Sequence, residues 1–226
     1  MTRTVAQAVR KYQSSFENNR LHRYRSWEHC YRFFQQGPIA VKKNRDAAAL
    51  HLAFYLASWG MYRGSGFLLN WTYQVHSEAI DTLLNSSRRL WGLDFGADEK
   101  HADLVPEIFE VGRALKNAYG RFGIPTDTLI TKVLLGTLGC SPACDRFFIA
   151  GFKETGNPYS YWNQSFLARI FVFCRRQRNA LSHEQKRIQK SAKVHYPYAK
   201  LADMYFWQIG LNRAQRSLSN RRSSEP

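Results

Sequence analysis

The 226-residue sequence has few of the features that mark secreted, metal-binding or membrane proteins. Its four cysteines, Cys30, Cys140, Cys144 and Cys174, show no paired framework, and no His pair follows Cys140 and Cys144 at zinc-finger spacing. No apolar segment near the N-terminus has the form of a signal peptide. We therefore expect free thiols, no bound metal ion and a cytoplasmic protein of prokaryotic type.

Long hydrophobic runs and cofactor signatures are also missing. The longest apolar run, AAALHLAFYLASWGM at residues 47–61, is too short to span a bilayer and contains His51. The sequence has no P-loop, no dinucleotide fingerprint and no Gly-x-Ser-x-Gly motif. We expect a buried helix over 47–61, no membrane partner and no cofactor.

Acidic residues are scarce, with 17 Asp and Glu against 33 Lys and Arg, so the net charge is +16. Residues 1–45 and 175–193 are strongly basic, whereas residues 78–110 carry an excess of acids. A surface of this kind attracts polyanions, with nucleic acid ahead of an anionic membrane. We predict double-stranded DNA as the partner, because a basic face and an acidic flank would orient an approaching duplex.

The remaining composition favours a packed helical protein. Apolar residues make up 44% of the chain and aromatic residues 15%, which is ample for a core. Apolar positions repeat at helical spacing, as in the aromatic face Trp27, Tyr31 and Phe34, and no strand alternation is seen. We predict a single, compact, all-α domain over residues 1–212. One long helix is expected over 161–193, a final helix stopped by Gly210, and a basic, Ser-rich, disordered tail over 213–226.

The stretch TKVLLGTLGCSPACDRFF, residues 131–148, predicts two short helices joined by a glycine turn at Gly136–Gly139. Ser141 suits the N-cap of the second helix and Pro142 its first position. A helix N-terminus reached through such a turn offers free N–H groups to a phosphate. Asp145, near the first turn, either offsets the helix dipole or acts on a sugar during N-glycosidic cleavage.

The same stretch resembles helix-hairpin-helix DNA glycosylases, in which a [Ser/Thr]-Lys-x-Leu helix precedes Pro-x-x-Asp-Arg. The resemblance covers about twenty residues and implies an all-helical, basic enzyme that flips a nucleotide into a pocket, with Asp145 as the catalytic carboxylate. The chain departs from that family in its Gly-x-x-Gly turn and in the short gap before the Asp. No iron–sulfur cysteine cluster follows, and Lys132 is not at the Schiff-base position, which implies a monofunctional enzyme. Lys132, Gly136, Gly139 and Arg146 are the expected DNA contacts of this helix-hairpin-helix-like element.

A second group of candidates follows from the run at 47–61. His51, Tyr55 and Trp59 share one helix face, with Tyr62 and Arg63 just beyond its end. Aromatic rings with a few polar groups are suited to hold an extruded base, although such a stripe is equally typical of a core. We predict that His51, Tyr55, Trp59 and Tyr62 form a base pocket, and that Arg63 contacts phosphates.

A third pattern lies in RRQRNALSHEQKR, where Arg178 and His183 have the Arg-x4-His form that resembles the active site of HEPN ribonucleases. In that family the His serves as acid or base and the Arg holds the phosphate, usually across a dimer, without metal. A solvated basic helix face is the plain alternative.

These observations predict a glycosylase-type hydrolase that releases a flipped damaged or modified base from DNA, in repair or in defence against phage with modified DNA. Asp145 should then lie in a positively lined cleft near aromatic rings. The alternatives are a HEPN-like endoribonuclease acting through Arg178 and His183, and a non-catalytic nucleic-acid-binding defence or accessory protein. The base and the oligomeric state stay open.

Overall fold

The chain is helical, as the sequence predicts. The computed structural model describes residues 4–222, and within this range there are eleven α-helices, four 3-10 helices and no strand. The α-helices are α1 (Val5–Ser14), α2 (Arg25–Phe34), α3 (Pro38–Lys43), α4 (Arg45–Ser58), α5 (Ser77–Leu84), α6 (Val105–Gly120), α7 (Asp127–Thr137), α8 (Arg146–Glu154), α9 (Gln164–Arg176), α10 (Arg178–Ala192) and α11 (Tyr198–Arg222). The 3-10 helices are η1 (Phe67–Asn70), η2 (Tyr73–His76), η3 (Arg88–Leu90) and η4 (Glu99–Leu104). The predicted all-α class is therefore confirmed.

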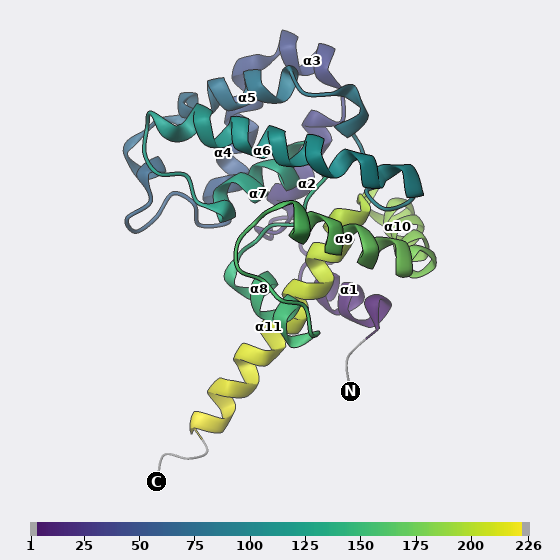
Figure 1. Cartoon of the computed structure of the whole chain (residues 1–226). Helices are drawn as coiled ribbons and strands as arrows, with labels where there is room; N and C mark the ends of the chain where they lie inside the picture. The colour runs from purple at the N-terminus through teal and green to yellow at the C-terminus, as the bar shows by residue number, and fades with distance from the viewer. Residues whose placement is uncertain (1–3, 223–226) are drawn as a thin grey trace.

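The helices form two neighbouring groups. Figure 1 shows α2 to α7 gathered at one end, and α1 with α8 to α11 at the other. In the first group α2, α4 and α7 pack on one another, and in the second α11 lies along α8 and α1. The connection from α7 to α8, residues 138–145, therefore runs from one group to the other.

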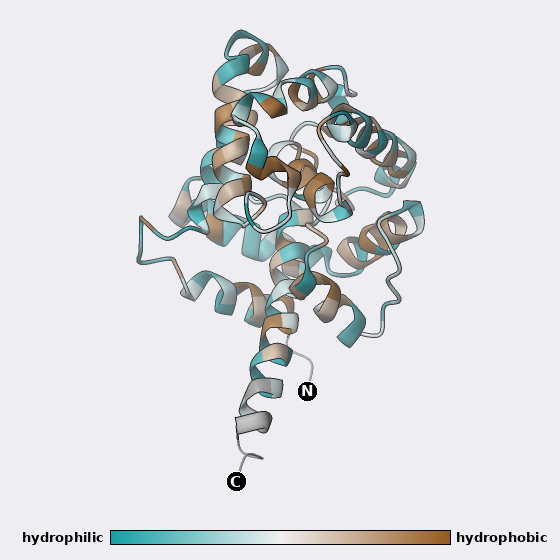
Figure 2. Ribbon diagram, turned by 90° about the vertical axis from the view of Figure 1, so that its left-hand side faces the viewer, coloured by the Kyte–Doolittle hydropathy of each residue, from teal (hydrophilic) through white to brown (hydrophobic). Residues whose placement is uncertain are grey.

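The core fills the space between these helices. Apolar residues concentrate in the inner segments, whereas hydrophilic residues dominate the outer helices (Figure 2). The predicted aromatic face of α2 is buried, since Trp27, Tyr31 and Phe34 are at most 1% exposed. Helix α7 is buried on every side from Leu129 to Thr137, so both faces of this helix meet protein.

The contact between α8 and α11 depends on two glycines. A Cβ atom added to Gly151 would overlap the backbone carbonyl of Phe206, and one added to Gly210 would overlap that of Phe147. The two backbones therefore approach more closely than any side chain would allow. This reciprocal contact fixes how α8 and α11 lie against each other.

Two predicted helix boundaries are wrong. The segment 161–193 is not one helix, because Gln177 separates α9 from α10. The break lets α10 bury Leu181, Glu184 and Ile188. Glu184 then pairs with Arg10 of α1. Gly210 does not end the last helix, because it serves the close contact with α8 while the backbone remains helical. Of the tail predicted to be disordered, 213–222 are helical, and 223–226 lie outside the described residues.

The four cysteines are free and buried, in keeping with the absence of a disulfide pattern. Burial raises the pKa of Cys140 to about 12. Over residues 4–222, no cluster of three or more His, Cys, Asp or Glu side chains is arranged to hold a metal ion. None of the helices in this range has both the length and the apolar character needed to cross a membrane.

Candidate active site

Asp145, and not the predicted Ser141, is the N-cap of α8. Its Oδ1 accepts the backbone N–H groups of Phe147 and Phe148 at 3.1 and 3.0 Å. Its Oδ2 lies 3.3 Å from the Lys132 ammonium of α7, and 17% of the side chain is exposed. Asp145 therefore both caps a helix and presents a carboxylate of fixed orientation at the protein surface.

A second ion pair lies beneath the first. Lys200 and Asp203, one turn apart on α11, are joined by a 2.9 Å ion pair, and both are almost fully buried. Burial raises the pKa of Asp203, while the Lys200 charge opposes this effect. The Asp145 carboxylate also raises the pKa of Asp203, because the two negative charges repel each other.

The indole of Trp59 joins the two pairs. The Lys132 ammonium lies 4.9 Å from the centre of the Trp59 ring system and the Lys200 ammonium 5.8 Å from it, within the range of cation–π attraction. Burying charged groups is costly even when they are paired. The contact of both ammonium groups with one indole ring therefore offsets part of the cost of burying them.

The connection that delivers Asp145 is tied down from two sides. Asp203 Oδ1 accepts the backbone N–H of Ala143 at 3.1 Å. Thr131 Oγ1 accepts the N–H of Cys144 at 2.8 Å, and Thr128 donates to the Cys144 carbonyl at 2.8 Å. Helices α7 and α11 thus hold the two residues immediately before Asp145, so the position of the carboxylate is set by the core.

The Asp145 carboxylate lines a cleft of about 550 Å³. This volume falls in the range of about 300–1,000 Å³ that is usual for ligand pockets. The aromatic residues of the lining come from three segments and the basic ones from four. They are Trp59, Tyr62, Phe147 and Trp207 among the aromatic residues, and Arg23, Arg63, Lys132 and Arg146 among the basic ones.

Several of the cleft's cations lie over its rings. The Arg23 guanidinium is 5.2 Å from the ring centres of both Tyr24 and Trp59, which stack on each other at 4.9 Å. The Arg146 guanidinium lies 4.5 Å from the ring centre of Phe147. The buried indole nitrogens of Trp59 and Trp207 have no acceptor within the described part of the chain. The lining is therefore rich in aromatic surface, positive charge and hydrogen-bond donors, with one carboxylate among them.

Six of the ten residues predicted for the glycosylase site lie together in this cleft: Trp59, Tyr62, Arg63, Lys132, Asp145 and Arg146. The other four do not line it. Tyr55 is 2% exposed and packs on Gly136 in the core, and His51 stacks on Phe33 at 4.4 Å.

The glycine turn is placed differently from the prediction. Gly136 lies inside α7, which continues to Thr137, and Gly139, with a positive φ of 70°, follows the helix end. Both glycines are buried, and Gly139 packs closely on Tyr31 and Pro197. A buried turn cannot seat a DNA backbone, so the expected phosphate contact at these two glycines is corrected.

The predicted site does not include Arg23, Phe147, Lys200, Asp203 or Trp207. Lys200 and Asp203 stand in an otherwise apolar helix, YAKLADMYFWQIG, and charged residues in such a run are the signal that points to a buried polar site. Arg23 and Trp207 carry no comparable signal, because they lie among many other basic and aromatic residues. Only the packing of α11 and of the segment before α2 brings them to Asp145.

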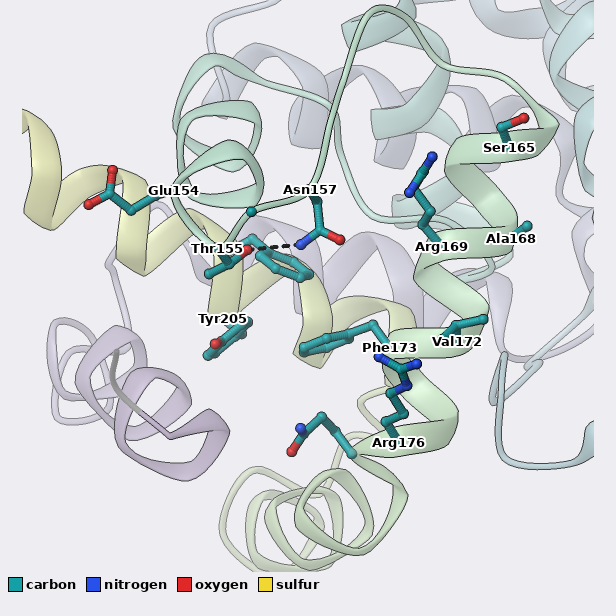
Figure 3. Close-up of a pocket in the computed structure, with 13 residues that line it drawn as sticks. Glu154, Thr155, Asn157, Ser165, Ala168, Arg169, Val172, Phe173, Arg176 and Tyr205 are labelled. Carbon is teal, nitrogen blue, oxygen red and sulfur yellow. Dashed lines mark hydrogen bonds between the residues drawn. The ribbon is translucent and has the colours of Figure 1, made fainter. Parts of the chain in front are cut away.

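A larger hollow, of about 890 Å³, lies at the other end of α8. Figure 3 shows its aromatic floor of Phe173 and Tyr205, with Arg169 and Arg176 along α9. The one carboxylate in its lining is Glu154, which is paired with Arg213 on α11. This hollow therefore offers no carboxylate comparable to Asp145.

Arg178 and His183 both lie exposed on α10. Five positions along an α-helix correspond to a rotation of about 140°, so the two side chains do not share a face. Arg178 borders a small basic hollow with Arg175, Arg176 and Asn179, whereas His183 does not. Within one copy of the chain, the structure does not bring the two residues together.

Comparisons with protein-family models, curated proteins and solved structures give no match to this chain. The resemblance to helix-hairpin-helix glycosylases therefore rests on the residues of the 131–148 stretch alone.

Proposed function

We propose that the protein is a monofunctional, glycosylase-like hydrolase that releases a damaged or modified base from DNA. The observation that carries this proposal is the position of Asp145, a carboxylate of fixed orientation in a cleft of aromatic rings and cations. A flipped nucleotide needs stacking surfaces for its base and positive charge for its phosphates. Trp59, Tyr62, Phe147 and Trp207 offer the first, and Arg23, Arg63 and Arg146 offer the second.

The chemistry follows from the charge that develops on the sugar. As the C1′–N bond breaks, its electron pair leaves with the base and C1′ becomes cationic. The negative Asp145 carboxylate stabilises this charge, an effect that is strong in a partly buried site. Water then adds to C1′ and loses a proton, while the departing base gains one, so the products are the free base and an abasic site.

The partner of Asp145 also bears on the reaction type. Lys132 is held in an ion pair with Asp145 and lies over Trp59. An ammonium in such a pair has no lone pair with which to attack C1′. This contact supports hydrolysis without a Schiff-base intermediate, and therefore without strand cleavage by the enzyme.

The test is the substitution Asp145→Asn. Asn is also a good N-cap, so α8 keeps its start while the negative charge is lost. Base release from labelled duplexes carrying different damaged or modified bases, scored as abasic sites, should fall at least about a hundredfold. DNA binding should be unchanged or tighter, because a negative charge near phosphate is removed.

The matched control is Asp98→Asn, which changes an exposed N-cap of η4 outside the cleft and should leave base release unaltered. Unfolding curves of both variants show whether each protein is folded. Full base release by the Asp145→Asn protein would overturn the proposal, and so would a substrate range without any released base. Borohydride trapping of a protein–DNA adduct would overturn the monofunctional assignment. Digestion of total RNA that is abolished by His183→Ala would establish the ribonuclease alternative, and DNA binding without any reaction would establish a non-catalytic role.

A further inference from the structure

A chain of three hydrogen-bonded side chains leads from the cleft into the core. Tyr62, which lines the cleft, has its hydroxyl 2.8 Å from Nε2 of His76. The other ring nitrogen of His76, Nδ1, lies 2.7 Å from the hydroxyl of Tyr119. His76 and Tyr119 are fully buried, whereas Tyr62 is partly exposed. The chain therefore has one end in the core and one end at the site.

The imidazole of His76 is neutral near pH 7, because burial lowers its pKa to about 3. A neutral imidazole carries one N–H donor and one acceptor nitrogen. One of the two tyrosines must therefore donate to the ring and the other must accept from it.

The direction is set by Tyr119. Its hydroxyl has His76 as its single hydrogen-bond partner among residues 4–222. If Tyr119 accepted from Nδ1, its own proton would be buried without an acceptor, which costs about 1–3 kcal/mol. The satisfied arrangement has Tyr119 donating to Nδ1 and the Nε2–H group donating to the oxygen of Tyr62.

This arrangement leaves the Tyr62 proton without an acceptor inside the described protein, because His76 is the one hydrogen-bond partner of that hydroxyl as well. We propose that Tyr62 donates a hydrogen bond from the cleft wall to an acceptor atom of the bound base, a ring nitrogen or a carbonyl oxygen, and that His76 and Tyr119 are the residues that position it. This inference rests on the proposed function, since it takes the occupant of the cleft to be a base. A hydrogen bond to the departing base stabilises the electron pair that it takes from C1′.

Burial raises the pKa of Tyr62 to about 12, so its hydroxyl keeps the proton that it donates. Asp145 and Tyr62 then have complementary roles. The carboxylate faces the charge that develops on the sugar, and the phenol faces the charge that develops on the base.

The direction of the chain is tested by ¹⁵N NMR of the imidazole nitrogens in the full-length protein at pH 7. The His76 signals should show Nε2 protonated and Nδ1 unprotonated, and the Tyr62→Phe variant should keep that tautomer because Tyr119 sets it. An Nδ1–H tautomer in the native protein would overturn the inference. The measurement needs no substrate, so its outcome is independent of whether base release is found.

The role of the donor is tested by Tyr62→Phe, which keeps the ring and removes the hydroxyl. On the duplex whose base the wild-type protein releases, kcat should fall about tenfold to hundredfold, as for the loss of one strong hydrogen bond, while KM changes little. Tyr119→Phe should also lower kcat, but by a smaller factor than Tyr62→Phe. Tyr73→Phe, the same change on η2 outside the cleft, is the matched control and should keep full activity. An unchanged kcat in the Tyr62→Phe protein, together with a lost kcat in the Asp145→Asn protein, would refute the donor role and leave the proposed function standing.

Discussion

The substitution Gly151→Ala tests whether the close contact of α8 with α11 holds the site together. The added methyl group would overlap the backbone carbonyl of Phe206 and would lie 2.9 Å from the backbone nitrogen of Gly210. Backbone atoms cannot rotate away as a side chain can, so the two helices must separate. Inserting a methyl group into a packed interior costs about 1–3 kcal/mol and sometimes more.

The expected net effect combines this cost with an opposing gain. Alanine is favoured over glycine inside a helix by about 1 kcal/mol. Because the overlap is with backbone, we take the cost at or above its upper value, which gives a net loss of about 2 kcal/mol or more. For a chain of this size, that loss corresponds to a decrease in Tm of about 4–8 °C.

The assay is urea unfolding of wild type, Gly151→Ala and Gly120→Ala. Gly120 ends α6, and a Cβ atom added there meets no atom within 4 Å. Gly120→Ala should therefore be neutral or slightly stabilising, whereas Gly151→Ala should lower the free energy of unfolding. Equal stability of the two variants would refute the inference that α8 and α11 are in backbone contact.

Two further predictions concern the buried polar groups. Asp203→Ala leaves the buried Lys200 ammonium and the Ala143 N–H without their partner, so the free energy of unfolding should fall by about 3–5 kcal/mol. The control Glu154→Ala breaks exposed ion pairs and should cost less than about 1 kcal/mol. Similar urea midpoints for the two variants would contradict the burial of the Lys200–Asp203 pair. The second prediction concerns pH. Burial lowers the pKa of His76 in the folded protein from 6.5 to about 3, so the unfolded chain binds the proton first as the pH falls. The contribution of neutral His76 to stability is therefore complete above pH 6.5 and declines towards pH 3, by up to about 1.4 kcal/mol per pH unit. Urea unfolding at pH 7 and pH 5 should show the decline in wild type and a smaller one in His76→Gln, and equal slopes would argue against it.

The sequence was sufficient to predict the fold class and six residues of the cleft. Helical periodicity and the lack of strand alternation predicted the all-α architecture, which is a local property of the chain. The 131–148 stretch predicted Lys132, Asp145 and Arg146, and the end of the 47–61 run predicted Trp59, Tyr62 and Arg63. Each of these groups lies within a few residues of a recognisable motif, and the structure brings both to one cleft.

The remaining features depend on contacts between distant segments. Gly210 has the form of a helix stop, but its missing side chain serves the contact with Phe147, which no local pattern reveals. Ser141 and Pro142 form a good helix start, yet the helix begins only after Asp145, because Asp203 and Thr131 accept the N–H groups of Ala143 and Cys144. The three rings of the predicted stripe have different environments: His51 stacks on Phe33, Tyr55 lies in the core and Trp59 lines the cleft. The neighbours of each ring, which come from distant segments, decide its role.

Helix α11 runs from the cleft to the outside of the molecule (Figure 1). Its 25 residues form one helix of about 37 Å. Arg213 and Arg216 pair with Glu154 of α8, and the last turns project from the other helices (Figure 1). Gly210, which is in close contact with α8, lies near the middle of α11. Because Trp207 and Asp203 lie on the same helix within two turns of Gly210, a shift of the contact with α8 would also move the aromatic wall of the cleft and the carboxylate that accepts the Ala143 N–H.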